Sequence, residues 1–220
     1  TVETGKYRPR FERRIDGIGK VGKARGLAVF GSTQGCILDI EVVAEKCENN
    51  GGITVTGAIE EEEISANRRK LRRKSSVSSS VKNTVTIMLN KFGINLNQYN
   101  LHINFPGCMP VDGPSAGIAI FCAVFSAVNN ITIPGTLALT GELSICGDVC
   151  GVGEVPLKIR AAKEQGAEKV IIPKANFQER FSCCGIEVVP VSSVFEVVEQ
   201  VFSKNEVKFE EKKKKKSEDI

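Results

Sequence analysis

The sequence predicts a single domain of mixed helices and strands, in the α+β or α/β class. Short runs of apolar or alternating residues, typical of strands, are interspersed with longer segments whose apolar residues recur at helical spacing. In the second half of the chain the two kinds of segment alternate. The 220 residues are 41% hydrophobic and 25% charged, which suffices for one buried core and is unlike a disordered chain.

Strand-like runs and one helix make up the first half. The strand-like runs cover residues 24–31, 35–43, 53–57 and 101–105. Residues 31–35 begin and end with glycine and separate the first two runs, so they predict a β-hairpin. Residues 81–92 place apolar side chains at helical spacing, and Gly93 ends the predicted helix.

The second half adds further helices and strands. The predicted helices cover residues 118–128, 156–165 and 194–202, and the predicted strands cover residues 136–140, 143–145, 169–173 and 185–191. We interpret the first two of these strands as a pair. Residues 169–173 are largely apolar and predict a fully buried strand.

Ser115 is the first candidate functional residue. It follows Gly113 and Pro114, and a continuous apolar run begins three residues later, so it is predicted at a turn-to-helix junction. Backbone N–H groups at a helix start have no partner within the helix, and the helix dipole is positive there. These groups could bind an oxyanion formed when Ser115 attacks a carbonyl. The alternative is that Ser115 only caps the helix.

Lys158 is the second candidate. Pro156 suits the first helical position and Gly166 the residue after the helix, which places Lys158 in the first turn. The positive end of the dipole and burial would both favour a neutral amine, the form that a general base requires. The alternative is an ordinary solvated lysine.

Several motifs together resemble the proteolytic domain of Lon-type proteases, over about residues 3–202. They are Asp112-Gly113-Pro114-Ser115-Ala116-Gly117, Thr140-Gly141-Glu142, Lys158-x-x-Ala161-Ala162 and Val170-Ile171-Ile172-Pro173-Lys174-x-Asn176. Residues 103–107 are more similar to B-type Lon proteins. The chain departs from the family pattern where Gly153 is followed by Glu154 instead of a second glycine, and where Val111 precedes Asp112.

The resemblance implies a serine endopeptidase with a Ser-Lys dyad and the fold of the second domain of ribosomal protein S5. Ser115 aligns with the family nucleophile, Lys158 with the base and Thr140 with a threonine that holds the lysine, while Asp112 has at most a modulating role. The loop residues that would shape the oxyanion site are Gly113, Pro114, Ala116 and Gly153. The strand expected to pair with an extended substrate contains Leu27, Ala28, Val29 and Phe30.

The resemblance also implies partners outside this chain. We expect a proteolytic domain over residues 1–203 and a charged, disordered tail over residues 204–220. The chain has no phosphate-binding loop motif, so we expect no cofactor here and assign ATP and Mg²⁺ to an upstream AAA+ module. The expected assembly is a homo-hexamer that cleaves unfolded polypeptides in the cytoplasm, with no membrane-spanning segment.

Other chemistries receive less support. The eight cysteines lack the spacing of zinc ligands, and the sequence contains one histidine, His102, so we expect neither a metal site nor a Ser-His-Asp triad. The basic run of residues 68–74 follows an acidic run and has no interleaved aromatic residues, which favours a solvated face over a nucleic-acid site. A nucleic-acid-binding module and a catalytically silent assembly domain remain the alternatives.

Overall fold

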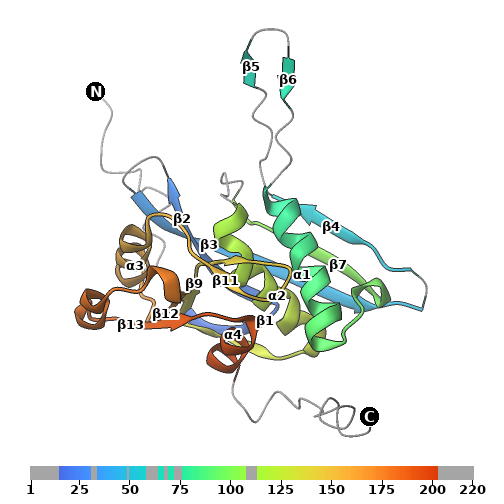
Figure 1. Cartoon of the computed structure of the whole chain (residues 1–220). Coiled ribbons are helices and arrows are strands. Elements are labelled where there is room, and N and C mark those ends of the chain that lie inside the picture. Colours follow the sequence, from blue (N-terminus) through green and yellow to red (C-terminus); the bar gives the residue numbers. More distant parts are fainter. Residues whose placement is uncertain are drawn as a thin grey trace, which may run out of the picture.

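A mixed seven-stranded sheet forms the centre of the protein (Figure 1). The computed structural model describes residues 15–202 apart from 31–33, 49, 58–63, 67–68, 72–75 and 108–112. The strands, in spatial order, are β13 (Glu187–Val191), β12 (Lys169–Pro173), β9 (Leu137–Leu139), β2 (Lys23–Phe30), β3 (Gln34–Lys46), β7 (Tyr99–Asn104) and β4 (Ile53–Thr56). The sheet is antiparallel from β2 through β3 to β7 and parallel on both sides of this central unit.

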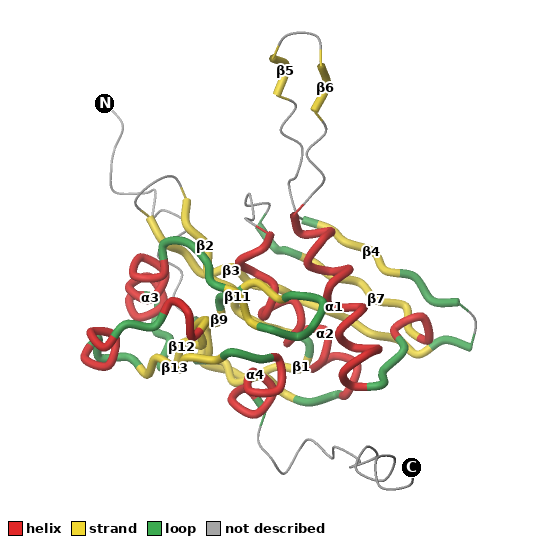
Figure 2. The backbone as a smooth tube through the Cα atoms, viewed as in Figure 1, coloured by secondary structure: helices red, strands yellow, loops and turns green. Residues whose placement is uncertain are grey.

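Helices cover both faces of the sheet (Figure 2). One face carries α1 (Ser76–Phe92), α2 (Gly117–Asn129) and α4 (Val194–Val201), and the other carries α3 (Val155–Glu164). The alternation of strand side chains divides the core between these faces. Ala28 of β2 packs in the cluster with α1, α2 and α4, whereas its neighbour Leu27 packs in the cluster with α3.

The residue patterns explain the central elements. In β3, Cys36, Leu38 and Ile40 are buried and alternate with half-exposed residues, because only one face of this strand is fully covered. Every residue from Gly117 to Ser126 of α2 is buried, which agrees with its apolar character on all sides. Helix α2 is therefore the central helix of the domain.

The structure corrects several predicted elements. Helix α1 begins at Ser76, five residues before the start predicted from the apolar spacing. The segments predicted as a strand pair at residues 136–140 and 143–145 do not pair, because β9 joins the large sheet while β10 (Glu142–Leu143) pairs with β11 (Val149–Cys150). A short sheet of β1 (Gly17–Val21) and β8 (Thr132–Gly135) was not predicted.

Some expectations fall outside the described residues. Asp112, the acidic run before residue 64 and the charged tail of residues 204–220 are among them. The backbone around the basic run is described only as β5 (Ile64–Ala66) and β6 (Arg69–Leu71), which pair with each other. In the part of the chain that is described, no helix has both the length and the apolar character needed to cross a bilayer.

Candidate active site

Ser115 lies in a short 3-10 helix, Gly113–Ala116, that leads directly into α2. The serine is 3% exposed. Its backbone carbonyl accepts a hydrogen bond from the N–H of Gly141 at 3.0 Å, and the Ile118 N–H donates to the Gly141 carbonyl at 3.0 Å. A side chain at Gly117 would come within 2.9 Å of the Leu143 nitrogen, so this position must be glycine. The serine segment is therefore held tightly against residues 141–143.

Thr140 follows β9 and connects the serine segment to the rest of the sheet. It is fully buried, and its backbone N–H donates to the Ile171 carbonyl of β12 at 3.0 Å. Its hydroxyl donates to the Ser115 carbonyl at 3.2 Å and accepts a hydrogen bond from Lys158 Nζ at 3.2 Å. One hydroxyl thus uses both its donor and its acceptor capacity to join the two candidate residues.

Lys158 lies in the first turn of α3, as predicted, and is 3% exposed. The helix begins at Val155, one residue earlier than predicted, so Pro156 is not its first residue. The Lys158 N–H donates to the Glu154 carbonyl at 3.2 Å. Glu154 caps the helix with φ of 56°, a left-handed conformation that glycine adopts more readily. A glycine at position 154 would adopt this conformation with less strain.

Two further side chains, which the sequence did not single out as site residues, lie near Lys158 or bind the loop before its helix. The first is Cys36 of β3, which is 2% exposed. Burial raises the pKa of its thiol, and a positive charge on the nearby Lys158 would lower it. Because residues 36 and 158 are far apart in the sequence, no local pattern could have predicted this proximity.

The second is Asn176, which fixes the loop before α3. Its side-chain oxygen accepts from the Val152 N–H at 2.8 Å, and its side-chain nitrogen donates to the Val152 carbonyl at 2.9 Å. Asn176 belongs to a short 3-10 helix, Lys174–Asn176, directly after β12, whose Ile171 binds Thr140. A single segment therefore orients both Thr140 and the loop that precedes Lys158. The sequence motif includes Asn176 but does not predict this role.

The predicted substrate strand lies within β2. Leu27 and Ala28 are buried and Val29 is half-buried, while β3 pairs with this strand as far as Phe30. On the other edge, the pairing of β2 with β9 is limited to Gly26 and Leu139. Residues 27–30 therefore extend beyond the end of β9. Strand β2 also lies beside the 3-10 helix that contains Ser115.

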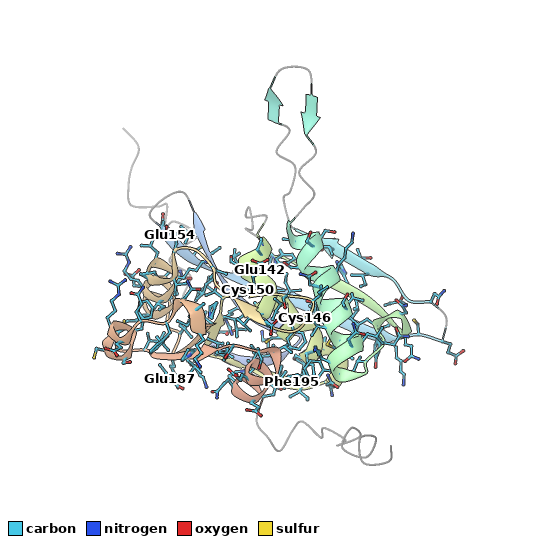
Figure 3. All side chains as sticks on the ribbon, in the orientation of Figure 1. Glu142, Cys146, Cys150, Glu154, Glu187 and Phe195 are labelled. Carbon is cyan, nitrogen blue, oxygen red and sulfur yellow. The ribbon has the colours of Figure 1, made fainter. Side chains whose placement is uncertain are left out.

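The remaining predicted residues are placed as follows. Gly113, Pro114 and Ala116 form the 3-10 helix with Ser115, and Gly153 lies in the loop before α3 with open space around its α-carbon. His102 lies on β7, where its Nε2 is 2.9 Å from the Thr56 hydroxyl. Glu142, two residues after Thr140, and Glu154, four residues before Lys158, have exposed side chains (Figure 3).

Within the described residues, no group of three or more His, Cys, Asp or Glu side chains is placed to hold a metal ion. The seven described cysteines are free thiols. The chemically distinctive feature of the structure is thus a buried serine and a buried lysine that are linked through Thr140. This arrangement defines a candidate serine–lysine hydrolase site.

Comparison with known proteins agrees with this class. Residues 3–204 match the family model described as the Lon protease (S16) C-terminal proteolytic domain. The chain therefore belongs to the Lon proteolytic domain family of serine peptidases.

Individual relatives support the same family. Lon protease 2 of Bacillus subtilis is 42% identical over 201 residues, which are 91% of this chain and 36% of that protein. The archaeal Lon protease of Thermococcus kodakarensis is 35% identical over 188 residues, 82% of this chain and 27% of that protein. That of Pyrococcus abyssi is 34% identical over 199 residues, 87% of this chain and 18% of that protein. The chain thus spans about a third or less of each of these relatives.

Proposed function

We propose that this chain hydrolyses peptide bonds through an acyl-enzyme, with Ser115 as nucleophile and Lys158 as general base. The observation that carries the proposal is the buried hydrogen-bonded chain from Lys158 Nζ through the Thr140 hydroxyl to the Ser115 carbonyl. The proposal is also supported by the burial of both residues, whose sequence positions are 43 residues apart.

The environment of Lys158 suits a base. Its side chain is 3% exposed and lies in the first turn of α3, where the helix dipole is positive. Loss of water and the positive helix end both favour the neutral amine over the ammonium ion. The Thr140 hydroxyl accepts a hydrogen bond from the amine, so the nitrogen lone pair of the neutral amine is directed away from Thr140.

The reaction consists of two acyl transfers, first from the peptide to Ser115 and then from Ser115 to water. The Ser115 oxygen attacks the scissile carbonyl carbon as its proton moves to Lys158, and backbone N–H groups around the 3-10 helix stabilise the oxyanion. The carbon–nitrogen bond then breaks, and the Lys158 ammonium protonates the leaving amine. Water attacks the resulting ester with Lys158 again as base, which releases the acid and restores the Ser115 hydroxyl.

Residues around the dyad would have supporting roles. Thr140 would orient Lys158, and Asp112 would have at most a modulating role. The loop residues Gly113, Pro114, Ala116 and Gly153 set the shape of the oxyanion site. An extended substrate would pair with β2 at Leu27–Phe30, beyond the point where β9 stops pairing. Recognition through the backbone suits unfolded polypeptides of varied sequence.

The activity of the longer protein is part of the same proposal. We infer that the chain works with an AAA+ module that binds ATP and Mg²⁺ and delivers unfolded proteins to a cytoplasmic hexamer. The support is family membership, together with the fact that this chain spans about a third or less of each relative's length. No cofactor is assigned to the chain itself.

Peptide hydrolysis tests the assignment. The chain is incubated with unfolded casein and with a fluorogenic unstructured peptide, in parallel with Ser115→Ala, Lys158→Met and His102→Ala variants. We expect both dyad variants to lose at least about a hundredfold in rate and His102→Ala to retain the parent rate. Retained hydrolysis in Ser115→Ala or Lys158→Met would contradict the proposal, as would loss of hydrolysis in a folded His102→Ala.

A further inference from the structure

We propose that residues 15–22, here called the strap, position the peptidase site, and that Asp16 is the positioning residue on which this depends. The proposal rests on the proposed function, since it concerns the same site. The strap consists of Ile15, Asp16, strand β1 and Gly22. It contacts three elements that carry or adjoin the candidate catalytic residues.

The first contact is with α3, the helix of Lys158. The Ile15 N–H donates to the carbonyl of Gln165, the residue that caps the end of α3, at 3.0 Å. The Ile15 side chain packs against the cluster that contains Ile159 and Ala162 of the same helix. One residue of the strap therefore fixes the C-terminal end of α3 through both backbone and side chain.

The second contact is with β2. The Asp16 carboxylate lies 2.7 Å from the guanidinium of Arg25, whose side chain is 4% exposed. The neighbouring acid, Asp39, lies 3.8 Å from Arg25 but is also 2.9 Å from Lys23. Within the described residues, the Arg25 Nε atom is buried and has no hydrogen-bond partner. Among the described residues, Asp16 is therefore the counter-charge closest to Arg25, and its removal would leave the buried guanidinium with only the longer contact to Asp39.

Arg25 is close to the site through the backbone. Its neighbour Gly26 pairs with Leu139 of β9, which directly precedes Thr140. The predicted substrate residues begin at Leu27, two positions after Arg25. A shift of β2 at Arg25 would therefore move the substrate strand and the threonine that binds Lys158.

The third contact is with α2, the helix that follows Ser115. The Gly22 N–H donates to the buried Ser126 hydroxyl of α2 at 2.8 Å. Strand β1 pairs with β8, which follows α2 in the chain. The strap thus connects the helix of Lys158 to the helix that follows Ser115.

Proton transfer requires the two residues to be placed accurately, because a shift of about 1 Å costs on the order of a hundredfold in rate. A segment that joins both helices and the intervening strand limits their relative movement. Asp16 is suited to the central role because it holds the strap to β2 between the contacts at Ile15 and Gly22. It is half-exposed and does not touch the dyad, so it acts only by positioning.

The test uses the full 220-residue chain with the substitutions Asp16→Asn, Arg25→Met, both together, and Lys20→Ala. In Asp16→Asn the amide keeps an oxygen for the Ile18 N–H, which Asp16 binds at 3.3 Å, and only the charge is removed. Lys20→Ala is the matched control, because it removes the exposed 3.9 Å ion pair of Asp16 with Lys20. The readouts are amide hydrogen exchange in α3, measured without substrate, and kcat and KM for an unstructured peptide.

We expect Asp16→Asn to accelerate exchange in α3 roughly tenfold and to lower kcat roughly tenfold, with KM within about twofold of the parent. Arg25→Met and the double variant should match Asp16→Asn, because the pair acts as a unit. Lys20→Ala should match the parent.

Three results would overturn the proposal. One is an Asp16→Asn variant whose amide exchange in α3 and kcat both equal those of the parent. Another is a double variant that regains parental values, since the unpaired Arg25 charge would then be the whole effect. The third is faster exchange confined to residues 15–22. The exchange measurement decides the role of the strap even if the chain cleaves no peptide, so this failure is distinguishable from failure of the proposed function.

Discussion

Lys158 donates a hydrogen bond to the Thr140 hydroxyl over 3.2 Å, and both side chains are almost completely buried. The same hydroxyl donates to the Ser115 carbonyl, so Thr140 orients the lysine and the serine segment together. The contact joins an end of β9 to the first turn of α3, and neither element could move alone without breaking it.

The substitution Thr140→Val should therefore lower kcat. Valine has the shape of threonine but leaves the Lys158 amine and the Ser115 carbonyl without this partner. A lost partner for a buried polar group costs about 1–3 kcal/mol, which corresponds to roughly 5- to 150-fold in kcat if it falls on the transition state. Peptide hydrolysis measures the effect. Thr140→Ser retains the hydroxyl and should stay within a few-fold of the parent, and an equally inactive serine variant would contradict this role.

Gly35→Ala should displace the helix of Lys158. An added side chain at residue 35 would lie 2.5 Å from the Leu157 carbonyl oxygen and 2.8 Å from Ala161, both in α3. Overpacking of this kind costs about 1–3 kcal/mol in the free energy of unfolding. Urea unfolding and peptide hydrolysis should both decline. Gly52→Ala is the control, because no described residue would lie within 4 Å of the added methyl group. An effect equal to that of Gly35→Ala would refute the explanation.

Glu154→Gly should stabilise the domain. A non-glycine residue in the left-handed region costs about 1–2 kcal/mol, while glycine loses more entropy on folding, by about 0.4–1 kcal/mol. The net gain in the free energy of unfolding, measured by urea denaturation, should be roughly 0.5–1 kcal/mol. Glu154→Ala removes the charge but keeps the strained φ of 56°, so it should bring no such gain. Equal stabilisation by alanine would show that charge is the cause.

Cys36→Asp should shift the pH dependence of hydrolysis to higher pH. Cys36 lies near Lys158, and burial raises the pKa of its thiol, so the native thiol is uncharged at neutral pH. A carboxylate there would favour the ammonium form of Lys158, which has no free lone pair. The rise of kcat with pH should then occur at higher pH than in the parent.

Cys36→Asn is the matched control for this charge effect. Asparagine has nearly the size of aspartate but no charge, so its profile should keep the parental midpoint even if the rate falls. Identical midpoints in all three proteins would show that a charge at position 36 does not influence the base.

The helices next to the two candidate residues could be predicted because the relevant sequence signals are local. Ser115 stands between Pro114 and an apolar helix, and Lys158 follows Pro156 at a helix start. Both helices form as expected, and the family assignment is confirmed by the match over residues 3–204. The hairpin of β2 and β3 was equally predictable from two apolar runs around a glycine-bounded turn.

The features that were missed depend on contacts between distant residues. Strand β1 is mostly exposed and becomes a strand by pairing with β8, more than a hundred residues later. Residues 143–145 looked like a partner of 136–140, but Gly141 instead binds Ser115 and directs β9 and β10 into different sheets. The hydrogen bonds of Asn176 to Val152 and the proximity of Cys36 to Lys158 likewise arise only from packing.

The central claim, that Lys158 activates Ser115, is tested most directly by covalent labelling. The chain and its Lys158→Met variant are treated with a peptidyl phosphonate, a reagent that forms a bond only to an activated nucleophile, and the modified residue and labelling rate are determined by mass spectrometry. The account predicts labelling of Ser115 in the parent and a rate at least about a hundredfold lower in Lys158→Met. Labelling of a different residue, or equal rates in the two proteins, would contradict it.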